Sequence, residues 1–270
     1  LPPSISFGGG GMIWPYYLGV GHFIYKNFDI EKISFASSSA GAFAAVPLAL
    51  GLDPYEWCQR DWPLCLYRFI QRPLGCLFDN SNSYYRLWNN YLPPNAHVRC
   101  TGRLYLSVTT LPGLKNVIIS KFETRHELLT SIVASTCLPF LFMRTIPYCK
   151  GIGYACDGGF TCDQPLINDL TVTCSVFNNH AYIKPKPHQY KVWDLIRIPS
   201  LQRAWEMARS AEFDCEKYHT LWQRYDWSSI RRKNPLQTPE LTPASYQLIH
   251  NRQQQLLRLI NHIKSGHHAH

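Results

Sequence analysis

A serine-rich turn between two apolar stretches constrains the fold of this chain more than any other feature. Residues 33–36 are typical of the end of a buried strand, and residues 41–46 of a small-residue helix packed closely on that strand. The turn between them carries Ser39. A serine at a sharp strand-to-helix turn holds its hydroxyl at the positive end of a helix, where developing negative charge is stabilised. The pattern predicts a nucleophile elbow with Ser39 at its tip.

A run of four glycines precedes this turn by about thirty residues, after another short apolar stretch. Such a run lets the backbone approach a ligand closely and point its N–H groups at an anion. It is not a dinucleotide-binding loop, because Trp14 stands where the third glycine of that fingerprint belongs, and no Gly-Lys-Ser/Thr follows to make a P-loop. A nucleophile preceded by an oxyanion cradle indicates acyl transfer.

A third motif, Asp157-Gly158-Gly159, places an aspartate at the end of a short expected strand and before a turn. Each motif is a common turn on its own. The elbow is also imperfect, because Ser37 stands where its first glycine is usual, giving S-x-S-x-G in place of G-x-S-x-G. All three motifs in this order are far less frequent by chance, which favours a serine hydrolase.

On these residues the chain resembles the patatin-like phospholipase family, and most of all its animal-type branch, which includes adipose triglyceride lipase. The resemblance covers residues 4–176 and rests on several segments that agree in order and spacing. They are residues 6–11 with 16–20, residues 38–42, the strand 104–109, residues 116–122, 127–129 and 135–140, and Asp157-Gly158-Gly159 followed by Pro165-Leu166.

The resemblance implies a Ser–Asp dyad on an α/β/α sandwich with a largely parallel central sheet. Ser39 is then the nucleophile that forms an acyl-enzyme, and Asp157 is the base that takes its proton. The oxyanion hole is made by the backbone N–H groups of Gly9, Gly10 and Gly11, while Ser37, Gly41, Gly158 and Gly159 shape the two turns. The implied function is hydrolysis of fatty-acyl esters in phospholipid, lysophospholipid or triacylglycerol, with no metal or organic cofactor.

Four positions depart from the family pattern. Ser37 and Trp14 replace glycines, Ile13 stands where plant-type relatives carry a basic residue, and Asp163 stands where relatives place asparagine. None of these removes a dyad residue or the cradle. They leave open a second interpretation, a catalytically silent lipid-binding protein on the same fold.

An α/β-hydrolase triad of Ser39, Asp157 and His180 has the correct chain order. That fold usually places several strands before its elbow, whereas this elbow comes by residue 39, and His180 lies in a polar turn. His22 falls on an expected helix and is interpreted as a packed core residue.

Strands are expected over residues 4–7, 32–36, 104–109, 117–122 and 170–175, and helices over 17–26 and 125–134. We expect a catalytic core over residues 1–183. An exposed linker at 184–188 then leads into a helical C-terminal region over 184–270 that packs on the core, with helices near 200–218 and 246–264.

A net charge of +9 with 8 tryptophans and 16 tyrosines suits an anionic lipid surface better than nucleic acid, because the best basic cluster is only Arg231-Arg232-Lys233. We therefore expect an intracellular protein, peripheral to a membrane or lipid droplet, that binds lipid substrate, favours anionic lipids and binds no nucleic acid.

The ten cysteines contain no C-x-x-C pair and fit reduced thiols. The apolar segment 61–78 is either a lid or membrane-docking element, or packs on the sheet.

Overall fold

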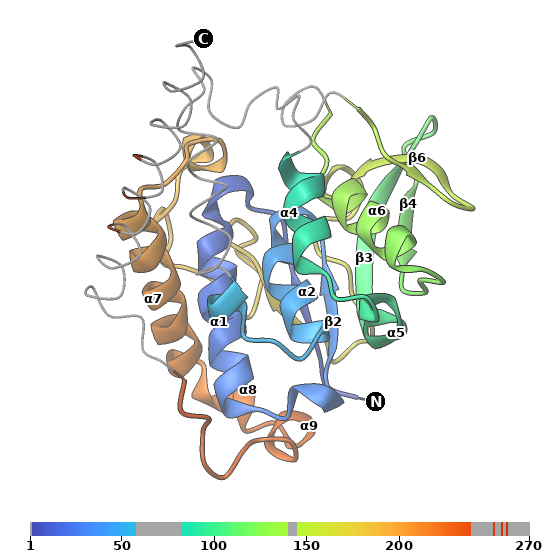
Figure 1. The fold of residues 1–270 in the computed structure, drawn as a ribbon. Coiled ribbons are helices and arrows are strands. Elements are labelled where there is room, and N and C mark those ends of the chain that lie inside the picture. Colours follow the sequence, from blue (N-terminus) through green and yellow to red (C-terminus); the bar gives the residue numbers. More distant parts are fainter. Residues whose placement is uncertain are drawn as a thin grey trace.

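The computed structural model describes residues 2–57, 83–139 and 145–238, with residues 251, 255 and 258 (Figure 1). The expected apolar segment 61–78 lies outside the described residues, as does the expected helix 246–264 apart from those three positions. The chain has the predicted α/β fold, with a central sheet flanked by helices.

The sheet joins seven strands in the order β5-β6-β3-β2-β1-β7, with β4 paired to β3. The strands β1 (Ser4–Phe7), β2 (Ser34–Ser37), β3 (Leu104–Leu111) and β7 (Val172–Cys174) run parallel. The strands β4 (Asn116–Ile119), β5 (Tyr148–Cys149) and β6 (Gly153–Asp157) extend it by antiparallel pairing. Every strand expected from the sequence is present, and 4–7 has the predicted bounds.

Two strands that are far apart in sequence end beside each other on β3. Leu106 of β3 pairs with Ser37 of β2 and Ile119 of β4, while Val108 pairs with Asp157 of β6 and Val117 of β4. A strand has only two edges, and β4 takes one of them. The last residues of β2 and β6 therefore meet on the other edge, opposite two positions of β3 that face the same way.

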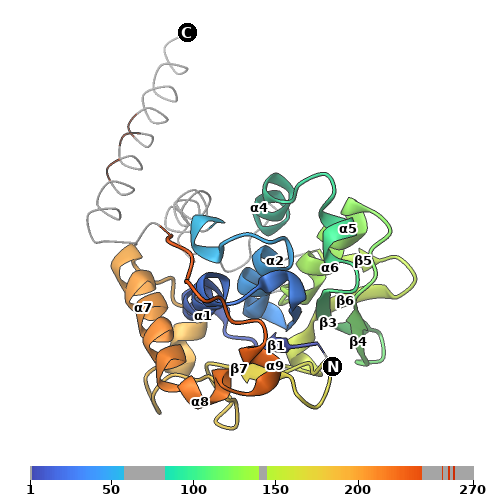
Figure 2. The same cartoon turned by 90° about the horizontal axis from the view of Figure 1, so that it is seen from below.

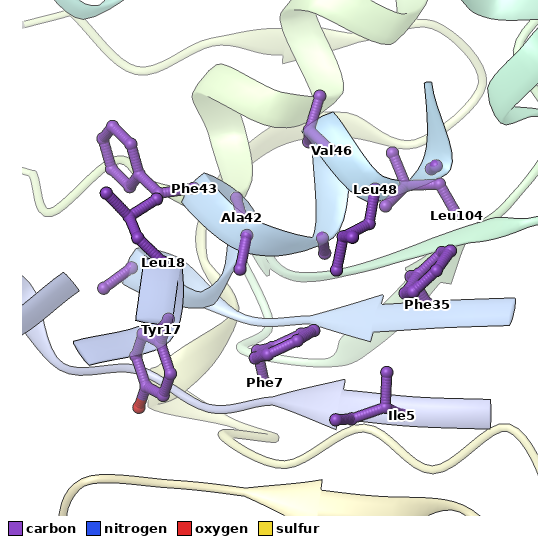
Figure 3. Close-up of a cluster of buried hydrophobic side chains, with 14 of the residues drawn as sticks. Ile5, Phe7, Tyr17, Leu18, Phe35, Ala42, Phe43, Val46, Leu48 and Leu104 are labelled. Atoms are coloured by element: carbon purple, nitrogen blue, oxygen red, sulfur yellow. The ribbon is translucent and has the colours of Figure 1, made fainter. Parts of the chain in front are cut away.

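One face of the sheet is apolar and is covered by helices. Side chains alternate along a strand, so Ile5, Phe7 and Phe35 point to the same side, where they pack under α2 (Ala42–Ala49) (Figure 3). The helices α1 (Trp14–Asn27), α2 and α6 (Arg125–Ser135) lie over this face (Figure 2). Every residue of α2 is buried, which explains its small apolar composition.

The opposite face carries small polar side chains that bind the chain segment 161–171. Ser4 Oγ lies 2.9 Å from Thr171 Oγ1, Gln164 Nε2 donates to Ser6 Oγ at 3.0 Å, and Ser107 Oγ donates to the carbonyl of Cys162 at 2.9 Å. These contacts lead the chain after Asp157 back across the sheet towards the glycine run.

The C-terminal part packs against α1. The long helix α7 (Leu201–Lys217) runs along α1 (Figure 1). Trp222 packs against Phe23 in a tilted arrangement, and Trp227 packs edge-on against Phe28 at the end of α1. The remaining helices are short: α4 (Ser83–Tyr91), α5 (Ala96–Cys100), α8 (His219–Trp222), α9 (Tyr225–Ser228) and the 3₁₀ turns η1 (Gly11–Ile13), η2 (Ile30–Lys32), η3 (Ser39–Gly41), η4 (Gly158–Phe160) and η5 (Val192–Leu195). Within the described ranges, none of the helices is long and apolar enough to cross a bilayer.

Candidate active site

Ser39 lies at the tip of a strained strand-to-helix turn. The strand β2 ends at Ser37, the turn η3 begins at Ser39, and α2 follows at Ala42. The backbone of Ser39 has φ 52°, a left-handed conformation that costs a residue with a Cβ about 1 kcal/mol or more. The side chain is half-buried. Strain of this kind persists where the surrounding structure holds it, and it is concentrated at functional sites.

The substituted glycine of the elbow does not carry this strain. Ser37 is still part of β2 and pairs with Phe7 and Leu106 in extended backbone, which accepts a Cβ. Gly41 is the position where a side chain has no room, because a Cβ there would lie 2.3 Å from the carbonyl oxygen of Phe7. The chain thus keeps glycine at position 41, where α2 meets β1, and accepts serine at position 37, which lies in β2.

Asp157 is the last residue of β6 and lies in the protein interior. Its exposed fraction is 1%, its backbone N–H donates to the carbonyl of Cys137 at 2.8 Å, and its Oδ1 accepts from the N–H of Gly159 at 2.8 Å. Its Oδ2 is buried and makes no well-formed hydrogen bond with any described residue. One carboxyl oxygen of Asp157, Oδ2, is thus available to accept a hydrogen bond or a proton.

Burial raises the pKa of Asp157 from an ordinary 3.8 to about 7. Interaction with the Ser39 hydroxyl and the hydrogen bond from Gly159 lower this pKa, and the charge of Asp163 raises it further. A carboxyl whose pKa lies near 7 is partly ionised at neutral pH, and its ionised form is a stronger base than an ordinary aspartate. The sheet register brings this group to the side of Ser39.

The glycine run is held on both sides of Gly9, through its N–H and its carbonyl. The hydroxyl of Tyr17 donates to the carbonyl of Gly9 at 2.7 Å, and the N–H of Gly9 donates to Asp163 Oδ1 at 2.7 Å. Gly10 precedes η1, and Gly11 begins it with φ 51°. Trp14, at the start of α1, is buried and stacks on Phe43. The tryptophan that replaces the family's glycine is therefore part of the hydrophobic core.

Asp163 is the site residue that the motifs did not identify. It comes from the segment 161–171 and reaches Gly9 across a sequence separation of 154. The one signal in the sequence was that it stands where relatives place asparagine. Gly158 and Gly159 begin η4 beside it, and a Cβ on Gly159 would lie 3.5 Å from Asp163 Oδ1.

Among the described histidines, His180 and His22 make their contacts with residues outside this arrangement. His180 is exposed, and its backbone N–H donates to Asn178 Oδ1 at 2.9 Å within the expected polar turn. His22 is buried in α1, where its Nδ1 lies 2.9 Å from Asp53 Oδ2, as a packed residue of the core.

Several known proteins are similar in sequence to this chain. No family model matches the chain. Patatin-like phospholipase domain-containing protein 2 of Rattus norvegicus is 27% identical over 209 residues, which is 71% of this chain and 41% of the relative. Patatin-like phospholipase domain-containing protein 4 of Homo sapiens is 27% identical over 191 residues, 68% of this chain and 75% of the relative. A 1-acylglycerol-3-phosphate O-acyltransferase of Homo sapiens is 26% identical over 190 residues, 68% of this chain and 39% of the relative.

The chain therefore spans about two fifths of the length of the rat relative. The predicted resemblance is confirmed: the chain is similar in sequence to the patatin-like phospholipase domain-containing proteins.

Proposed function

We propose that this protein is a lipid acyl hydrolase that cleaves fatty-acyl esters of glycerolipids through an acyl-enzyme on Ser39. The observation that carries the proposal is the meeting of a strained, half-buried serine with a buried carboxyl of pKa about 7, at two strand ends aligned on β3. Strained backbone and a strongly shifted pKa cluster at functional sites.

The chemistry follows from the positions of these groups. Ser39 Oγ attacks the ester carbonyl and passes its proton to the ionised Asp157. The negative oxygen of the tetrahedral intermediate is bound by N–H groups of Gly9, Gly10 and Gly11, near the start of η3 and α2. When the intermediate collapses, the C–O bond to the alcohol breaks, and the proton on Asp157 passes to the departing alcohol.

The second half of the reaction regenerates the enzyme. Water loses a proton to Asp157 and attacks the acyl-enzyme, which releases the fatty acid and returns the proton to Ser39. An alcohol in place of water gives acyl transfer by the same steps. One relative is named as an O-acyltransferase, so the assay should offer both acceptors.

The substrate is best presented at an interface. The net charge of +9 favours anionic lipid, and Val192 and Trp193 of η5 are 71% and 73% exposed beside the glycine run that η5 contacts. Amphipathic aromatic rings favour the headgroup region of a lipid surface. We infer that the protein works on the surface of a membrane or lipid droplet.

The test is an assay of fatty-acid release and acyl transfer on mixed micelles of phospholipid, lysophospholipid or triacylglycerol. Wild type is compared with Ser39→Ala, Asp157→Asn and His180→Ala. We expect the first two to lose activity by at least about 10³-fold and His180→Ala to keep it. Activity that survives Ser39→Ala, or is lost in His180→Ala, would contradict the dyad.

One observation favours a second candidate, a silent lipid-binding protein. The carboxyl of Asp163 already occupies the N–H of Gly9 that an oxyanion would use. A fluorophosphonate probe separates the two, because it reacts with an activated serine and leaves a silent one unlabelled. Lipid binding by a wild type that takes up no probe would establish the second candidate.

A further inference from the structure

Asp163 lies inside the candidate oxyanion hole. Its Oδ1 accepts the N–H of Gly9 at 2.7 Å, and a Cβ on Gly9 would lie only 2.6 Å from the same oxygen. Its neighbours in the chain are fixed to the sheet, Cys162 through Ser107 Oγ and Gln164 through the carbonyl of Ser6. The position of the Asp163 carboxyl is therefore built into the fold.

A negative charge at this point opposes the reaction in two ways. An ionised Asp163 competes with the oxyanion for the Gly9 N–H and repels the charge that develops beside it. It also acts on the base, since its charge raises the pKa of Asp157. The Tyr17 hydroxyl holds the next peptide group through the carbonyl of Gly9, which restrains the glycine run beside the carboxyl.

Titratable side chains from three places in the described part of the chain interact with the charge of Asp163. Asp157 approaches from the end of β6, Tyr17 from α1 and Cys162 from its own segment, and the Asp163 charge raises the pKa of all three. Burial raises the pKa of Asp163 itself, and the hydrogen bond from Gly9 lowers it. Among the ion pairs formed by described residues, none involves Asp157 or Asp163.

We propose that Asp163 is a positioning residue that restrains this site: ionised, it retains the Gly9 N–H, and protonated, it yields that N–H to the oxyanion. The inference rests on the proposed function of Ser39. The active form then holds one proton on the carboxyl pair, with Asp157 ionised and Asp163 neutral. The two apparent pKa values that govern activity are therefore properties of this coupled pair of carboxyls and of neither residue alone.

The wild type should therefore show a bell-shaped dependence of activity on pH. Protonation of Asp157 removes the base on the acid side, and ionisation of Asp163 blocks the Gly9 N–H on the alkaline side. In Asp163→Asn the neutral amide keeps the shape of the carboxyl without its charge. The alkaline decline should disappear, and the acid limb should move to lower pH because Asp157 loses a repelling neighbour.

The experiment measures the rate at which a fluorophosphonate labels Ser39 between about pH 5 and pH 9, in wild type and Asp163→Asn. Asp169→Asn, which removes an exposed carboxyl from the same segment, is the matched control. We expect Asp163→Asn to be labelled at least about tenfold faster than wild type at the alkaline end, with no such gain in the control.

The outcomes separate the two proposals. Labelling of wild type with an unchanged or slower profile in Asp163→Asn overturns the restraint and leaves the proposed function standing. Absence of labelling in every variant overturns both. A direct titration of the Asp157 carboxyl by ¹³C NMR gives a readout without catalysis, and its pKa must fall in Asp163→Asn. If that variant does not fold, Asp163→Ser serves the same comparison.

Discussion

At the scale of single residues, the buried carboxyl of Asp157 lowers the stability of the folded protein when it is ionised, the form in which it is proposed to act as a base. Its pKa is raised by burial to about 7 in the folded state, against 3.8 ordinarily. The folded protein therefore binds a proton that the unfolded chain has lost between about pH 4 and pH 7, and stability falls as pH rises through this window. Below about pH 4 the carboxyl is protonated in both states and does not change the free energy of unfolding. Above about pH 7 the loss of stability is complete and no longer depends on pH.

Asp157→Asn should remove this loss while it removes activity. A shift of this size corresponds to about 4 kcal/mol at most, so we expect the variant to be more stable than wild type by up to that amount near pH 8 and equal to it near pH 4. Urea unfolding at the two pH values measures the difference, with Asp169→Asn as the control. A variant that is no more stable at the higher pH would mean that Asp157 is ionised in the fold without penalty.

At the scale of elements, the crossing of α1 and α7 depends on one glycine. A Cβ on Gly19 would lie 2.0 Å from the carbonyl oxygen of Ala208 in α7, too close for any rotation of a side chain to relieve. On Gly21 of the same helix, the nearest atom is 2.8 Å away and belongs to the side chain of Pro54. The two glycines thus differ in whether backbone or side chain must move.

Gly19→Ala should destabilise the protein by about 2 kcal/mol or more, because separation of the helices outweighs the roughly 1 kcal/mol that alanine gains over glycine in a helix. Gly21→Ala should cost clearly less. Denaturant unfolding of both variants tests the comparison. Equal costs would show that α7 adjusts its position on α1 freely.

The elements themselves were largely predictable from the sequence, since periodicity and turn residues are local. The strand Ser4–Phe7 has its predicted bounds, whereas residues 32–36 became Ser34–Ser37 because Ile30–Lys32 forms a 3₁₀ turn. Motifs also indicated Ser39 and Asp157. The contact of Asp163 with Gly9 was not predictable, because it depends on how the segment 161–171 crosses the sheet, which no local pattern encodes.

At the scale of the whole molecule, an aromatic cluster connects the proposed core, residues 1–183, to the C-terminal helices. Trp222 is 1% exposed and packs against Phe23, Phe28 and Trp227, while its Nε1 donates to the carbonyl of Cys215 at 2.8 Å. The cluster joins the end of α1 to α8 and α9. The C-terminal helices therefore share buried apolar contacts with the N-terminal part.

Trp222→Ala should then destabilise the entire protein by about 3–5 kcal/mol, since it leaves a large cavity where the two parts meet. Unfolding should remain one cooperative transition, displaced as a whole, by far-UV circular dichroism and by tryptophan fluorescence alike. Trp193→Ala, at a side chain 73% exposed, is the matched control and should change stability by less than about 0.5 kcal/mol. A first transition that loses only part of the helical signal would instead show that residues beyond 183 unfold on their own.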